Sequence, residues 1–132
     1  MAEAHLLDTS AMLTFIENEN GADRVETLLR QPETIVTWVT MVEVYYITLQ
    51  ERSEVDAERR HALIKALPIK FVMSVDESTM LEAARLKARY KISFADAVIG
   101  ATAISHKATL VHKDREYEQL TGLLKMESLP YK

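Results

Sequence analysis

The 132-residue sequence contains no cysteine and only three glycines and three prolines. Without cysteine the chain can form no disulfide, use no thiolate nucleophile and offer no thiolate ligand to zinc. The scarcity of glycine and proline indicates short loops. The four histidines show no spacing typical of a zinc site, and no glycine-rich phosphate loop is present.

An excess of positive charge is also missing, because the formal net charge is −4. This argues against a general nucleic-acid coat protein, although a nuclease with clustered acids remains compatible. No secretory signal is visible, and the most apolar run, residues 34–49, is shorter than a bilayer span and contains Glu43. We therefore expect a cytoplasmic protein with no membrane segment, folded as one domain over residues 1–132.

Helical and strand-like patterns alternate along the chain, which predicts an α/β layered fold with a mostly parallel sheet. Strands are expected at residues 4–8, 34–37, 69–73, 108–111 and 126–129. Helices are expected after a cap at Thr9 or Ser10, around residues 25–29, at 39–51 and 55–67, from 76, from 93 and at 114–120.

Two of the expected helices differ in pattern. The helix that opens at residues 76–78 is predicted to bury Met80, Leu81, Ala84 and Ala88. The helix that starts at Ser93 is apolar nearly all round, which predicts a place in the interior.

Four carboxylates stand at or inside apolar stretches: Asp8, Glu43, Asp96 and Asp114. Burying several carboxylates without a cation is costly and raises their pKa values. Two of these acids end predicted strands and two lie in early turns of predicted helices, positions that share one edge of a parallel sheet. We therefore expect the four acids to meet and to bind one or two Mg²⁺ or Mn²⁺ ions, which points to phosphate chemistry.

Helix capping is the structural alternative for every one of these acids. Asp8 and Asp114 precede predicted helices, and Glu43 and Asp96 stand at the capping-box position, three residues after a Thr or Ser. Asp96 is the strongest single candidate, because no other charged side chain occurs between residues 91 and 107.

At these residues the chain resembles the PIN-domain family, specifically the VapC-type toxins of bacterial and archaeal toxin–antitoxin pairs. The resemblance covers essentially the whole chain. It rests on four blocks: Leu7-Asp8-Thr9-Ser10, Thr40-x-x-Glu43, residues 92–101 from Ile92 to Ala101, and residues 110–117 from Leu110 to Tyr117.

The resemblance implies a three-layer α/β/α domain and a Mg²⁺- or Mn²⁺-dependent endoribonuclease, the toxin of a type II toxin–antitoxin system. It further implies an RNA substrate, a homodimer and a cognate antitoxin whose C-terminal segment blocks the active-site groove. The residues it assigns to metal binding and to positioning the attacking water are Asp8, Glu43, Asp96 and Asp114, with Ser10, Ser93 and Glu116 as auxiliary residues.

One position departs from the family pattern. Members usually carry Thr or Ser two residues before the last Asp, and this chain has His112 there. An imidazole can hydrogen-bond a carboxylate or contact RNA, and it can also weaken metal affinity. The alternative function is therefore a non-catalytic PIN-like module that binds RNA or an antitoxin.

Overall fold

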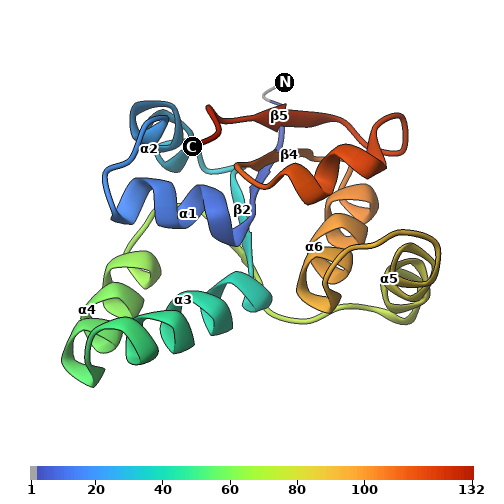
Figure 1. Ribbon diagram of the computed structural model, residues 1–132. Coiled ribbons are helices and arrows are strands. Elements are labelled where there is room, and N and C mark those ends of the chain that lie inside the picture. The colour runs from blue at the N-terminus through green and yellow to red at the C-terminus, as the bar shows by residue number, and fades with distance from the viewer. Residues whose placement is uncertain (1–2) are drawn as a thin grey trace.

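A five-stranded parallel sheet forms the centre of the computed structural model, which describes residues 3–132 (Figure 1). The strand order is β3-β2-β1-β4-β5, and all four neighbouring pairs are parallel. The strands are β1 (His5–Leu7), β2 (Ile35–Thr37), β3 (Lys70–Val72), β4 (Thr109–His112) and β5 (Met126–Ser128). The sheet predicted as mostly parallel is thus parallel throughout.

Helices connect the strands, and each lies within a few residues of its predicted range. They are α1 (Thr9–Ile16), α2 (Ala22–Leu29), α3 (Trp38–Glu51), α4 (Glu54–Lys65), α5 (Glu77–Arg89), α6 (Phe94–Ser105) and the 3₁₀ helix η1 (Arg115–Leu120).

Alternation along the strands builds two cores, one on each face of the sheet. Leu6 and Leu110 belong to the core formed with α5, α6 and η1, whereas Leu7 and Val111 belong to the core formed with α1 to α4. This follows from the two-residue period of a strand, which points successive side chains to opposite faces. Figure 1 shows α5 and α6 on one side of the sheet and α1 to α4 on the other. The three-layer α/β/α arrangement is confirmed.

Side-chain caps set where the helices near the carboxyl edge of the sheet begin. The Asp8 carboxylate accepts the Ala11 N–H at 2.8 Å, so Asp8 caps α1 in place of the predicted Thr9 or Ser10. Thr37 caps α3, as its extended backbone allows. Ser93 caps α6, as predicted. Each such cap contributes about 1 kcal/mol to helix stability.

The predicted buried face of α5 is wrong. Met80 is 53% exposed and Leu81 is 44% exposed, and Ala84 and Ala88 are exposed as well. The residues that α5 buries are Thr79, Ala83 and Leu86. This stripe lies one residue, or about 100°, round the helix from the apolar stripe at 80, 84 and 88. The fold therefore leaves an apolar stripe on the surface of α5.

Helix α6 occupies the interior, as its composition predicts. Every residue from Asp96 to Ala103 is buried, although Phe94 in the first turn is 69% exposed. Neither α6 nor any other helix within residues 3–132 combines the length and the apolar character that crossing a bilayer requires.

Candidate active site

The topology of the sheet brings two of the predicted acids to one edge. Asp8 directly follows β1, and Asp114 lies two residues after β4. These strands are neighbours, with Leu7 opposite Val111, and the strand order reverses between them. Ligands of open α/β sheets gather beyond the carboxyl ends of the strands at such a reversal.

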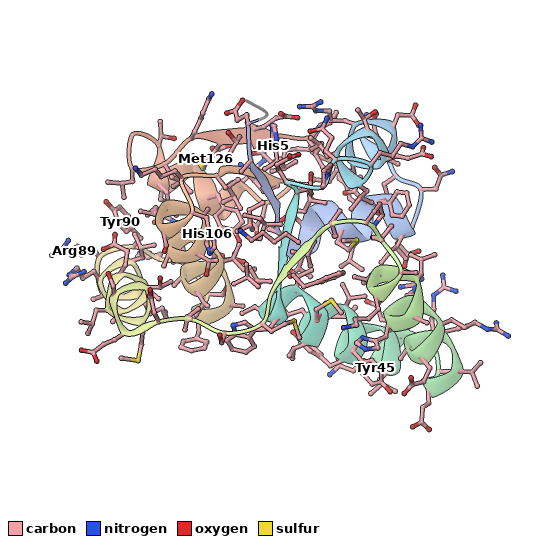
Figure 2. All side chains as sticks on the ribbon, turned by 180° about the vertical axis from the view of Figure 1, so that it is seen from behind. His5, Tyr45, Arg89, Tyr90, His106 and Met126 are labelled. Carbon is pink, nitrogen blue, oxygen red and sulfur yellow. The ribbon has the colours of Figure 1, made fainter. Side chains whose placement is uncertain are left out.

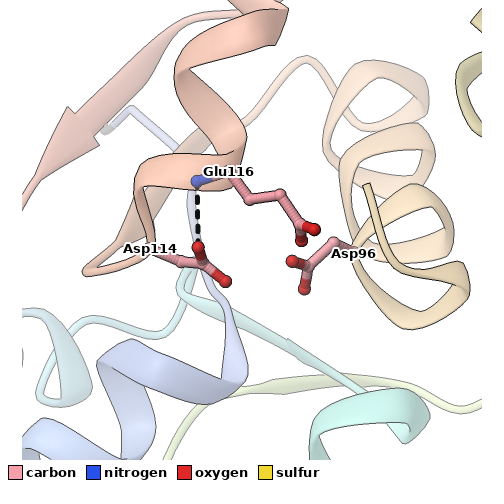
Figure 3. Close-up of side chains that lie close together, drawn as sticks. All are labelled: Asp96, Asp114 and Glu116. Atoms are coloured by element: carbon pink, nitrogen blue, oxygen red, sulfur yellow. Dashed lines mark hydrogen bonds between the residues drawn. The ribbon is translucent and has the colours of Figure 1, made fainter. Parts of the chain in front are cut away.

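Three carboxylates converge at this edge, as Figure 3 shows. Asp96, Asp114 and Glu116 each offer an oxygen, and these oxygens all lie within 4.8 Å of one another. The Glu116 N–H donates to Asp114 Oδ1 at 2.9 Å and so orients that carboxylate. We call these three residues the acid cluster. Glu116, expected only as an auxiliary residue, lies directly in it.

Asp8 is buried beside the acid cluster and is held by several donors. The Ser10 hydroxyl lies 2.7 and 2.8 Å from the two Asp8 oxygens, and the Lys113 N–H donates to Ser10 Oγ at 2.9 Å. Burial raises the pKa of Asp8 to about 7, and the negative charge of Asp114 adds to this effect. Ser10 thus ties Asp8 to the end of β4.

Burial also raises the pKa of Asp96, and the neighbouring Glu116 carboxyl raises it further. The hydrogen bond with Asp96 lowers the pKa of Glu116, which is less buried. The Tyr117 hydroxyl opposes the upward shift, because it donates to Asp96 Oδ1 at 2.9 Å. Two carboxyls this close to each other favour either a shared proton or a cation.

Glu43 is held separately from the acid cluster. It lies half-buried in the second turn of α3, where the Thr9 hydroxyl donates to Glu43 Oε1 at 2.6 Å. The Thr9 hydroxyl is also 3.2 Å from the Thr40 hydroxyl. Since Thr9 follows Asp8 in the chain, this contact places Glu43 against the start of α1. Within residues 3–132, neither Glu43 nor Asp8 belongs to the group of oxygens within 4.8 Å.

Ser93 and His112 act on the backbone that carries the acids. The exposed Ser93 accepts the Asp96 N–H at 3.1 Å, which starts α6 with Asp96 in its first turn. His112 is buried, and its Nδ1 accepts the Asp114 N–H at 3.2 Å. Burial lowers the pKa of His112, which favours the neutral ring that such an acceptor requires. His112 therefore supplies an acceptor, as a Thr or Ser hydroxyl also can.

Two contacts to the acids are not foreseeable from the sequence. Thr9 is part of the first block of the resemblance and Tyr117 ends the last one, but nothing in the local pattern shows that they bond Glu43 and Asp96. Both hydrogen bonds join elements distant in the chain, so they depend on the packing of α1 against α3 and of η1 against α6.

The donor set of the acid cluster suits a hard divalent cation. Its members offer carboxylate oxygens, which are the ligands that Mg²⁺ and Mn²⁺ prefer. The upward pKa shifts of Asp8 and Asp96 show that negative charge is unfavourable here, and a cation would relieve that cost.

A family model described as the PIN domain matches residues 5–123. Among curated protein sequences, none matches this chain.

Solved structures of similar fold include toxin–antitoxin proteins. VapBC2 from Rickettsia felis, bound to a DNA fragment from its promoter, matches with a TM-score of 0.78 and 13% identity, covering 96% of this chain and 99% of that chain. DNA-bound VapBC from Salmonella typhimurium matches with a TM-score of 0.73 and 18% identity, covering 97% of this chain and 98% of that chain. VapC20 from Mycobacterium tuberculosis is described as a Sarcin-Ricin loop cleaving toxin. It matches with a TM-score of 0.70 and 13% identity, covering 88% of this chain and 94% of that chain.

The raised pKa of Asp8 predicts how stability depends on pH. In the unfolded chain Asp8 releases its proton near 3.8, whereas in the folded protein it does so near 7. Between these pH values the unfolded chain has released this proton, whereas the folded protein still holds it. The free energy of unfolding therefore falls as the pH rises, by up to about 1.4 kcal/mol per pH unit. Asp8→Asn cannot ionise and escapes this loss.

We therefore expect Asp8→Asn to gain stability relative to the wild type as the pH rises from about 5 to about 7 with EDTA present. Urea unfolding of both proteins at each pH measures the difference, in which the opposing titration of His112 cancels. Saturating Mn²⁺ should shrink the gain by stabilising the wild type. If the difference in free energy of unfolding between the two proteins stays constant or falls as the pH rises, the pKa of Asp8 is not raised in the folded protein.

Proposed function

This chain belongs to the PIN-domain family, and from that premise we propose that it is a divalent-metal-dependent endoribonuclease, the toxin of a type II toxin–antitoxin system. The observation that carries the proposal is the convergence of Asp96, Asp114 and Glu116 at the sheet edge, with Asp8 buried beside them. The likeness to VapBC structures and to VapC20, described as a Sarcin-Ricin loop cleaving toxin, supports it.

In the proposed site Asp8, Asp96 and Asp114 would hold Mg²⁺ or Mn²⁺, and Glu43, which lies apart from the acid cluster, would help to position the attacking water. Glu116 offers a further oxygen from within the acid cluster. When bound, the metal ion activates water and stabilises negative charge on the phosphodiester. Ser10 and Thr9 fix the carboxylates that they hydrogen-bond, so part of the site is ordered before substrate arrives.

Cationic side chains near the acid cluster support an RNA substrate. The pKa of Glu116 is lowered mainly by the hydrogen bond with Asp96, and the positive charge of Lys87 on α5 adds a smaller effect in the same direction. Arg115 is exposed at the start of η1, directly beside two of the acids. Both can meet the RNA backbone through salt-dependent phosphate contacts. Arg89, the last residue of α5, points outward from the molecule (Figure 2).

A large cleft next to Ser10 supports an antitoxin partner. Its volume is about 1060 Å³, and its lining runs from Ser10 and Lys113, beside Asp8, to Glu17 and Arg52 at the far ends of α1 and α3. Charges of both signs in such a cleft suit a polypeptide segment. We infer that the antitoxin lies here and that its end covers the acids.

The exposed apolar stripe of α5 supports a homodimer. Met80 and Ala84 line a hollow of about 450 Å³ together with Trp38 and Val98, and the 69% exposed ring of Phe94 stands at the same hollow. Apolar side chains gathered in this way usually mark an interface. A two-fold interface needs one self-complementary patch, and a projecting ring beside a hollow provides one.

Asp96→Asn tests the nuclease proposal. The amide keeps the shape of the side chain and removes its charge, so the variant should fold but cleave RNA at least about 100-fold more slowly, since even partners of metal ligands contribute 10- to 100-fold. Incubation of a structured and a single-stranded RNA with Mg²⁺ or Mn²⁺ measures cleavage, and EDTA should abolish it. Asp23→Asn, the same change at an exposed position on α2, is the matched control.

Undiminished cleavage by Asp96→Asn, or cleavage that persists in EDTA, would overturn the metal-dependent mechanism. A wild type that binds RNA or antitoxin without cleaving RNA would favour the non-catalytic alternative instead.

Ala84→Glu tests the proposed dimer face. A carboxylate in the hollow would be desolvated between two subunits, so the variant should elute as a monomer while the wild type elutes at twice the chain mass of 15.0 kDa. Light scattering after size exclusion measures both masses. Ala62→Glu, at an exposed position on α4, should remain dimeric. A monomeric wild type would overturn the proposed homodimer. A dimeric Ala84→Glu variant would show that the interface lies elsewhere.

A further inference from the structure

Tyr117 is a fully buried tyrosine whose hydroxyl reaches the acid cluster. Its exposed fraction is 0%, and its hydroxyl donates to Asp96 Oδ1 at 2.9 Å. A buried tyrosine usually finds a hydrogen-bond partner for its hydroxyl, and most buried hydroxyls can satisfy that need on the backbone. Here the partner is a carboxylate that is proposed to bind metal, so the bond has a consequence beyond packing.

The position of the Tyr117 hydroxyl is fixed from several directions. The Tyr117 N–H donates to the Asp114 carbonyl at 3.2 Å. The ring packs against the His112 ring, with centroids 5.1 Å apart and planes at 52°. The same side chain belongs to the core between the sheet, α5 and α6. A hydroxyl held in this way acts as a rigid donor.

The Asp96 carboxylate needs such a donor to hold one orientation. The last torsion of an aspartate side chain has a broad, roughly two-fold energy profile, so its two oxygens are not fixed by the backbone. The Ser93 cap holds the Asp96 N–H and leaves the carboxylate free to turn. The Tyr117 hydroxyl occupies Oδ1 in the orientation that directs this carboxylate toward Asp114 and Glu116 (Figure 3).

Tyr117 completes a pattern shared by the other acids. Ser10 donates to Asp8, Thr9 donates to Glu43, and the Glu116 N–H donates to Asp114. Each of the four acids is therefore restrained by a donor from its own or a neighbouring element. Of the three hydroxyl donors, Tyr117 alone is also a large core side chain.

We propose that Tyr117 is a positioning residue of the metal centre, whose hydroxyl orients the Asp96 carboxylate for a divalent cation. The inference rests on the proposed function, because it requires Asp96 to be a metal ligand. Removal of the hydroxyl should leave the fold intact and weaken the metal site, since hydrogen-bond partners of metal ligands typically contribute about 10- to 100-fold to metal affinity.

Calorimetric titration with MnCl₂ alone tests this inference on the wild type, Tyr117→Phe and Tyr90→Phe. Tyr117→Phe deletes one oxygen and keeps the ring that packs on His112. Tyr90→Phe is the matched control, because Tyr90 stands at the C-terminal end of α5 (Figure 2) and, within residues 3–132, its hydroxyl donates to none of the acids. We expect the Kd for Mn²⁺ to rise about 10- to 100-fold in Tyr117→Phe and to stay unchanged in Tyr90→Phe.

Two further measurements separate positioning from a merely structural role. Circular dichroism in EDTA should show the same secondary structure for all three proteins. RNA cleavage by Tyr117→Phe should fall at limiting Mn²⁺ and recover when Mn²⁺ saturates the weakened site. Equal Kd values for the wild type and Tyr117→Phe, or a cleavage defect that excess Mn²⁺ does not relieve, would overturn the positioning role of Tyr117. Neither result would affect the proposed function. A wild type that binds no Mn²⁺ would overturn the proposed function, and this inference with it.

Discussion

Repulsion among buried carboxylates is the constraint on which the rest of this structure depends. The reversal of strand order between β1 and β4 places Asp8 and Asp114 at one edge of the sheet, and the first turn of α6 adds Asp96. Burial raises the pKa values of Asp8 and Asp96, so ionising these carboxyls in the folded protein reduces its stability. A divalent cation bound there would offset that cost, which would link the stability of the fold to the proposed chemistry.

The capping and functional interpretations of the acids are compatible. Asp8 caps α1 and Asp114 caps η1, yet both also lie at the sheet edge with the other acids. A cap uses one carboxylate oxygen for backbone N–H groups and leaves other lone pairs available. Capping thus orients an acid without consuming it, and the Ser10 and Tyr117 hydroxyls do the same for Asp8 and Asp96.

The order of the elements and the sheet edge at which Asp8 and Asp114 lie could be predicted, because both follow from local patterns, whereas the separate position of Glu43 and the place of Glu116 in the acid cluster could not. Alternating apolar residues predict strands, and strand ends predict the edge where Asp8 and Asp114 lie. The buried face of α5 could not be predicted, because an apolar stripe such as Met80 and Ala84 has the same pattern whether it meets the core or another subunit. The hydrogen bond from Tyr117 to Asp96 could not be predicted from the sequence either, since it depends on how η1 packs on α6.

Diffraction from crystals soaked in Mn²⁺ would show whether the carboxylates at the sheet edge bind a metal ion, because the anomalous signal of manganese locates the ion without reference to activity. We expect a peak within coordination distance of carboxylate oxygens of Asp96 and Asp114, on the side facing Asp8. Manganese bound only at acids remote from the sheet edge, or no peak at saturating Mn²⁺, would contradict it.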